Sequence, residues 1–146
     1  MNRNTGGEGR RVDRLLDSSL ESVDSAEELA LSAAVRAGFE EEDLHKIGMA
    51  VRESMINAVV HGNRYSAHKK VHLIVADEPG QLTVTIADEG EGFDFHSVPD
   101  PLSPDNLLRA SGRGIFLIRA FMDDFQVRRL LPAGTEVTLV KYKVSK

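Results

Sequence analysis

The sequence contains no cysteine in its 146 residues. Disulfide bonds, zinc sites built on thiolates and thiol nucleophiles are therefore excluded together. The chain also lacks any apolar run near the roughly 20 residues that a membrane-crossing helix needs, and its start, MNRNTGGEGRR, has no apolar segment typical of a signal peptide. We therefore expect a cytoplasmic protein with no membrane segment.

Basic residues are not in excess either. The net charge is −5 and the basic residues are scattered among acids, so the sequence does not indicate a nucleic-acid-binding face. The common nucleotide signatures are also missing: there is no Gly-Lys-Ser/Thr phosphate loop, no HRD and DFG pair, and no GxGxxG after a first strand. Partners are expected to be proteins or small molecules, and any nucleotide site must be of another type.

The strongest pattern in the chain is the stretch 44–63, LHKIGMAVRESMINAVVHGN, which is typical of a long amphipathic helix. At helical spacing one broad apolar stripe forms, and its members are Leu44, Ile47, Val51, Met55, Ala58 and Val59. A narrower apolar flank lies opposite, so Glu53 and Asn57, one turn apart, share a polar strip between two apolar borders.

Two interpretations of that strip remain open. Charged and polar residues on a helix face are most often simply solvated. Alternatively, a carboxylate can act as a general base, and an amide oxygen one turn later can be a hard ligand for Mg²⁺ in phosphate chemistry. The pair Glu53 and Asn57 does not decide between them without the rest of the chain.

The other elements predict one α/β domain over residues 11–146, after a polar, glycine-rich lead-in at 1–10 that we expect to be disordered. An edge strand is expected within 11–20 and a helix over 25–39, ended by its glycine at position 38. Alternating apolar residues then predict strands on either side of a turn at 78–80, and a helix from 115 followed by two more strands. This order indicates a two-layer α/β (α+β) sandwich, with helices on one face of a mixed, mostly antiparallel sheet.

Two glycine motifs lie at the ends of these elements. Asp88-x-Gly90-x-Gly92 follows a buried strand, where a carboxylate can accept from an exocyclic amine such as that of adenine, although an ordinary acidic turn has the same pattern. Gly112-x-Gly114 precedes a helix whose free N–H groups favour phosphate oxygens, although a flexible lead into the helix explains it as well. Residues 93–112 form a long stretch with few apolar anchors, and loops of this length are usually either functional or disordered.

Taken in order, four stretches resemble the nucleotide-binding boxes of the Bergerat-type ATP-binding fold of gyrase and histidine kinases. They are ESMINAVVHGN from residue 53, DEGEG from 88, SGRGIFLI from 111, and the pair Gly134-Thr135. Within that superfamily the chain is similar to the bacterial anti-sigma-factor serine/threonine kinases over most of its length. NAVVHGN, DEGEGFD and RAFMDDF are the stretches that narrow the resemblance to this family.

The resemblance implies a role for each matching residue, with ATP or ADP and Mg²⁺ as cofactors. Glu53 matches the general base that takes the proton from the attacking hydroxyl, and Asn57 matches the Mg²⁺ ligand. Asp88 would hold the adenine amino group, with Thr135 supporting adenine recognition through water.

The same resemblance implies a closing segment over the phosphates. Gly90 and Gly92 would shape the pocket wall, and residues 93–112 would be a mobile lid. The residues expected over the phosphates are Gly112, Arg113 and Gly114. Arg113 is equally explained as an exposed, solubilising side chain.

The implied function is that of a switch kinase, which phosphorylates a STAS-type anti-anti-sigma partner and, in its other partner state, holds a sigma factor inactive. The resemblance also implies that the kinase is a homodimer. Two alternatives stay open: a kinase of a partner-switching module that binds no sigma factor, and a nucleotide-dependent binding module without turnover. A histidine-kinase fragment is disfavoured, since the only histidine before Glu53 is His45, on the same helix. His61 is expected to have a supporting role, and the surface histidines are His45, His68, His72 and His96.

Overall fold

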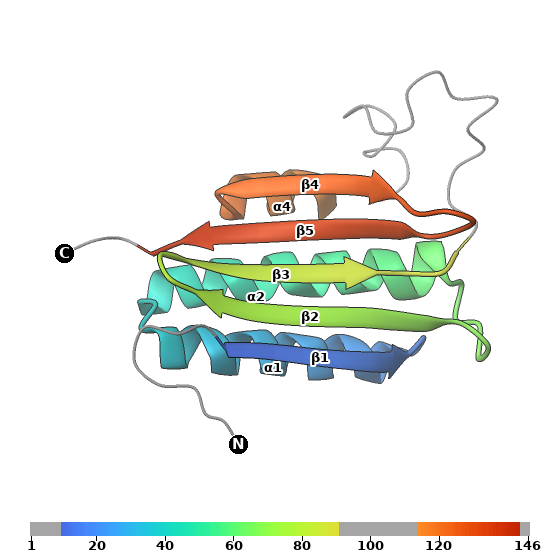
Figure 1. Ribbon diagram of the computed structural model, residues 1–146, viewed down its shortest axis with the longest axis horizontal. Coiled ribbons are helices and arrows are strands. Elements are labelled where there is room, and N and C mark those ends of the chain that lie inside the picture. The colour runs from blue at the N-terminus through green and yellow to red at the C-terminus, as the bar shows by residue number, and fades with distance from the viewer. Residues whose placement is uncertain (1–9, 91–113, 144–146) are drawn as a thin grey trace.

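A computed structural model describes residues 10–90 and 114–143 (Figure 1). The elements are β1 (Arg10–Asp17), α1 (Leu20–Ala37), α2 (Glu41–Ile56), the π-helical η1 (Asn57–Gly62), β2 (Lys70–Glu78), β3 (Gln81–Ala87), α4 (Gly114–Phe121), β4 (Asp124–Arg129) and β5 (Thr135–Tyr142). No helix in these two ranges is long and apolar enough to cross a membrane.

The strands form one five-stranded sheet in the order β1-β2-β3-β5-β4, and the helices all lie on one of its faces (Figure 1). The predicted two-layer α+β sandwich is therefore confirmed. Every pairing between the described strands is antiparallel, so the mixed sheet that was expected is replaced by a uniform one. β1 is an edge strand as predicted, and it begins at Arg10, one residue before the expected start of the domain.

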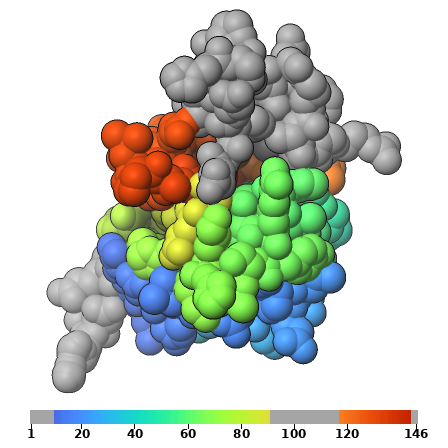
Figure 2. Space-filling model, turned by 90° about the vertical axis from the view of Figure 1, so that its right-hand side faces the viewer, coloured from blue at the N-terminus to red at the C-terminus, as the bar shows by residue number. Residues whose placement is uncertain are grey.

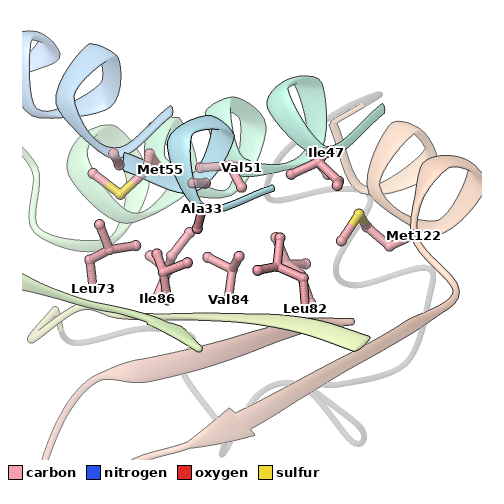
Figure 3. Close-up of a cluster of buried hydrophobic side chains, with 14 of the residues drawn as sticks. Ala33, Ile47, Val51, Met55, Leu73, Leu82, Val84, Ile86 and Met122 are labelled. Atoms are coloured by element: carbon pink, nitrogen blue, oxygen red, sulfur yellow. The ribbon is translucent and has the colours of Figure 1, made fainter. Parts of the chain in front are cut away.

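The core lies between the sheet and the helices (Figure 3). Alternate residues of the two central hairpin strands face it, which explains their period of two; they are Val71, Leu73, Val75, Leu82, Val84 and Ile86, all at most 1% exposed. The helical stripe packs onto them and was also predicted correctly, with Ile47, Val51, Met55, Ala58 and Val59 buried and Leu44 partly buried.

Helices α1 and α2 both differ from the prediction, and α2 begins at Glu41, three residues before the expected Leu44. α1 begins at Leu20, after Ser19 in an extended conformation, and not at Ser25. Ser22 and Val23, which were read as residues before the helix, are buried in its first turns, because these turns already pack on the core. The end was predicted correctly: Gly38 has φ 92°, and its N–H bonds to the carbonyls of the last turn.

The second difference concerns the central helix, which is not α-helical to its end. After Ile56 it continues as the π-helical η1, and the N–H of Asn63 donates to the carbonyl of Ala58, five residues back, at 2.8 Å. π-helical turns are rare and occur often at functional sites. The helix ends at Gly62, so Arg64, with φ 52°, lies beyond it.

One end of the molecule collects the ends of several elements. β3 ends there, β5 begins there, and η1 ends beside them, at the right of Figure 1 and facing the viewer in Figure 2. The four stretches with the family motifs include residues at this end of the sheet. Residues 88–90 and the turn before β5 meet here, so the glycine motif after β3 lies against residues 44 or more positions later.

Candidate functional site

Asp88 is the buried polar centre of this end of the molecule. It follows β3 directly and is only 7% exposed. Its backbone N–H donates to the Thr135 carbonyl at 2.9 Å, which continues the β3–β5 ladder by one bond. Its carboxylate oxygen Oδ1 accepts two backbone hydrogen bonds, from Gly90 N–H at 2.9 Å and from Thr135 N–H at 3.3 Å. The side chain is therefore fixed from two strands at once.

Opposing effects act on the charge of this carboxyl group. Burial raises the pKa of Asp88, since the ionised form loses its hydration, and the hydrogen bonds from Gly90 and Thr135 and the charge of Lys69 act in the opposite direction with smaller weight. All its hydrogen bonds within the described residues go to Oδ1. Oδ2 therefore keeps the capacity to accept from an incoming donor.

Three glycines form a niche around this carboxylate. A Cβ on Gly62 would lie 2.4 Å from Asp88 Oδ2, and one on Gly134 would lie 2.3 Å from the Asp88 carbonyl oxygen. A Cβ on Gly90 would lie 2.0 Å from the Gly62 carbonyl oxygen. Contacts this short are not tolerated, so η1, the turn after β3 and the turn before β5 approach one another only because none of the three has a side chain.

Glu53 and Asn57 lie on the helix that ends at this niche. Glu53 is in the last turn of α2 and Asn57 opens η1; both are partly buried, and the Asn57 N–H donates to the Glu53 carbonyl. Within residues 10–90 and 114–143 neither side chain has a hydrogen-bond or ion-pair partner. Four residues separate them, which is about 6 Å along a helix axis. A partly buried carboxylate and a neighbouring amide, neither of them paired within the described residues, are less well explained as a merely solvated face.

The donors at this end can be tested against a magnesium ion. No group of three or more His, Cys, Asp or Glu side chains in the described ranges could hold a metal on its own. Mg²⁺ does not require such a cage, because it keeps several waters and is bound through one or two protein oxygens together with substrate phosphates. A free amide oxygen such as that of Asn57 fits this donor set. A transition metal with several imidazole or thiolate ligands does not fit.

Part of the predicted site lies outside the described residues. Gly92, Gly112, Arg113 and the expected lid at 93–112 lie outside the described residues, as does His96. Gly114 is the first residue of α4, which packs against α2 and runs back along β4. Its start therefore faces the end of the sheet where β4 finishes and β5 begins, the same end as Asp88 (Figure 1).

The histidines take no metal-binding arrangement within the described chain. His61 is exposed near the end of η1, and His45 is exposed with its ring 6.3 Å from that of Phe121. His72 was expected to be a surface residue, and its side chain is 41% exposed. Its Nε2 lies 2.6 Å from Oδ1 of Asp13, on the neighbouring strand β1.

Asn63 is a site residue that the sequence analysis missed. It is 2% exposed, and its side chain makes three hydrogen bonds: Nδ2 donates to Ser18 Oγ at 2.9 Å and to the Lys70 carbonyl at 3.0 Å, and Oδ1 accepts from Glu89 N–H at 2.8 Å. Gly62 and Gly134 were likewise not assigned to a niche. Their sequence signal is only that of glycines near element ends, which does not show what they contact.

The sequence profile of the family described as "Histidine kinase-like ATPase domain" matches residues 16–141. This is the class of domain that the two-layer fold and the carboxylate at the end of β3 define. The same fold is found in the crystal structure of the RsbU and RsbW domains of a Mycobacterium tuberculosis protein, with a TM-score of 0.64 and 15% sequence identity, covering 91% of this chain and 32% of that one.

Curated relatives narrow the class. The serine-protein kinase RsbW of Staphylococcus epidermidis is 31% identical, covering 90% of this chain and 86% of its own. The RsbW kinase of Oceanobacillus iheyensis is 30% identical over 75% of this chain and 72% of its own, and the anti-sigma F factor of Bacillus thuringiensis is 34% identical over 69% and 70%. The chain therefore belongs to the anti-sigma-factor serine/threonine kinases of the histidine kinase-like ATPase superfamily. It is of the protein kinase class, and its nucleotide is ATP or ADP.

Proposed function

We propose that this kinase transfers the γ-phosphoryl group of ATP to a serine or threonine of a STAS-type anti-anti-sigma protein, and that in its other partner state it holds a sigma factor inactive. The names of the RsbW and anti-sigma F relatives support this role. The observation that carries the nucleotide part is the Asp88 carboxylate, buried in a glycine niche, with Oδ1 held by two backbone donors and Oδ2 without a hydrogen-bond donor among the described residues.

In this proposal the adenine ring enters beside Asp88. Its 6-amino group donates to Oδ2, which forms a charge-assisted hydrogen bond in a site already shielded from water. Thr135 supports recognition of the ring through a bridging water. Gly90 and Gly92 form the wall, where the lack of side chains lets the backbone approach the base.

The triphosphate then extends toward the helix that carries Asn57 and Glu53. Asn57 offers its amide oxygen to Mg²⁺, which would neutralise phosphate charge in the bound complex. Glu53 accepts the proton of the substrate hydroxyl as the hydroxyl oxygen bonds to the γ-phosphorus. The bond from that phosphorus to the bridging oxygen breaks, and ADP leaves with the electron pair.

Closure over the phosphates is assigned to residues 93–112. Gly112, Arg113 and Gly114 precede or open α4, whose first N–H groups have no partner within an α-helix and favour phosphate oxygens. Arg113 adds a positive charge next to them. The proposal also includes a homodimer in the cytoplasm, with no nucleic acid and no membrane as partner.

The direct test is phosphate transfer from labelled ATP to a STAS-domain protein encoded beside the kinase gene. Glu53→Gln removes the proton acceptor at almost constant shape, so transfer should fall at least about 100-fold while ADP affinity changes little. Glu28→Gln, the same change at an exposed position of α1, is the matched control and should transfer normally. Undiminished transfer by Glu53→Gln would remove the general-base assignment.

The metal assignment has its own test. Asn57→Ala should weaken binding of Mg-ATP much more than binding of ATP in EDTA, because only the first uses the amide oxygen as a ligand. Equal weakening in the two conditions would show that Asn57 is not a ligand.

Binding of a purified sigma factor, measured in the presence of ADP and of ATP, distinguishes the proposed function from its two alternatives. Phosphate transfer without sigma binding favours a kinase of another partner-switching module. Nucleotide-dependent partner binding without any transfer favours a module that does not turn over.

A further inference from the structure

Asn63 connects four parts of the chain that do not otherwise meet at one residue. Its backbone ends η1 and its side chain reaches Ser18 at the joint of β1 and α1, Lys70 at the start of β2, and Glu89 in the turn after β3. Ser18 is buried as well, and its hydroxyl donates to the Lys69 carbonyl. The amide thus lies within a closed polar network at the nucleotide end of the sheet.

Only one orientation of this amide satisfies the network. Two acceptors, Ser18 Oγ and the Lys70 carbonyl, face Nδ2, and a donor, Glu89 N–H, faces Oδ1. A flipped amide would place an NH₂ group against the Glu89 N–H and an oxygen against the Lys70 carbonyl. Three of the four side-chain hydrogen-bonding positions, including both N–H donors, are therefore committed, which makes Asn63 a rigid link rather than an adaptable one.

The bond to Glu89 has a direct consequence for Asp88. Glu89 N–H lies between Asp88 and Gly90, and the Gly90 N–H is one of the two donors that hold the Asp88 carboxylate. Asn63 therefore holds the turn that carries the adenine acceptor at a fixed distance from the end of η1. Asn57, the proposed metal ligand, opens the same six-residue helix.

We propose that Asn63 is a positioning residue of the nucleotide site, which sets the separation between the adenine acceptor Asp88 and the helix end that receives the triphosphate. It touches no nucleotide itself. Its acceptor oxygen sharpens the preference for adenine, because a turn displaced by an ångström no longer places Oδ2 opposite the 6-amino group. This inference rests on the proposed role of Asp88.

The test is binding of ADP and of inosine diphosphate, in which a carbonyl replaces the amine, by calorimetry in EDTA. Wild type should prefer ADP by roughly 10- to 100-fold, the value of one charge-assisted hydrogen bond. Asn63→Ala should lower that ratio by about fivefold or more, because it removes the acceptor of the Glu89 N–H. Asn63→Ser, too short to reach across, replaces the alanine variant if that variant does not fold.

A merely structural role predicts a different outcome. It would weaken both nucleotides alike, as we expect for Val23→Ala, a core change on α1 that lowers stability without touching the network. An unchanged ratio in both Asn63→Ala and Asn63→Ser, in a wild type that discriminates, would overturn the positioning role. A wild type that binds the two nucleotides equally would instead contradict the assignment of Asp88, on which the inference depends.

Discussion

Gly62→Ala tests the niche around Asp88 most directly. Helix propensity alone predicts a gain of about 0.5–1 kcal/mol from this change, because alanine is the better helix former. The new Cβ, however, would lie 2.4 Å from Asp88 Oδ2 and 2.5 Å from its Cγ, whereas ordinary contact begins at 3.4 Å. The carboxylate must therefore move by about 1 Å.

That movement has a calculable consequence. The bonds to Oδ1 from Gly90 and Thr135 are 2.9 and 3.3 Å long, and a displacement of this size stretches them beyond useful length. Loss of a hydrogen bond to a charged group costs about 1.5–3 kcal/mol, so the loss of even one of the two outweighs the gain in propensity and lowers stability by roughly 0.5–2.5 kcal/mol. The adenine contact is lost with it, and ADP affinity should fall roughly 10- to 100-fold.

Gly80→Ala is the matched control for this variant. Gly80 has φ 84° and open space around it, so alanine there costs about 1–2 kcal/mol of backbone strain at the far end of β3. The two variants should show similar losses in urea unfolding, but only Gly62→Ala should lose affinity for ADP in calorimetry. If Gly62→Ala binds ADP as tightly as wild type, the fixed carboxylate is not the adenine acceptor.

Three further predictions concern charge. Asp88→Asn should be more stable than wild type at pH 7 while binding ADP weakly. Because the folded-state pKa of Asp88 is raised, wild type gains stability as the pH falls through that pKa, so the difference in unfolding free energy should be smaller at pH 4 than at pH 7. Urea unfolding at the two pH values measures this, and a constant difference would contradict the prediction. Lys141→Met leaves the Phe121 carbonyl without its 2.9 Å donor at the end of α4, and should cost about 2–4 kcal/mol in the same assay, with a loss under 1 kcal/mol as the refuting result. Arg52→Met breaks exposed pairs to α1 and should cost less than about 1 kcal/mol, with no remaining difference from wild type in 1 M NaCl.

The regular elements could be predicted from the sequence because their signals are local. Strands β2 and β3 alternate between core and outer face, and the stripe on α2 repeats at helical spacing, so each pattern records burial directly. The start of α1 could not be predicted, since Ser22 resembles a capping residue and is instead buried against the core. The π-helical η1 is also missing from the pattern, because a change of 0.8 residue per turn over six residues hardly alters apolar spacing.

The site residues also divide into those that the sequence predicted and those that it did not. Asp88, Gly90 and Thr135 were predicted to lie together and do lie in one hydrogen-bonded group, while their roles toward a nucleotide stay predictions. Asn63 and Gly62 were missed because what matters about them is long-range. Apart from Lys70, seven residues after Asn63, their partners lie 26 residues or more along the chain, and a single sequence shows the residue but not the neighbour.

Because Asp88 pairs with Thr135, a ligand bound to this pair would also hold strands β3 and β5 together. These residues are 47 positions apart, and their two mutual bonds close the last rung between the central strands. A molecule that binds at this pairing stabilises the sheet against separation of its two halves, and the stabilisation free energy is RT ln(1 + [L]/Kd). If the nucleotide binds Asp88 as proposed, its occupancy and the integrity of the sheet are thermodynamically linked, and amide exchange that needs β3 and β5 to separate should slow by the factor 1 + [L]/Kd.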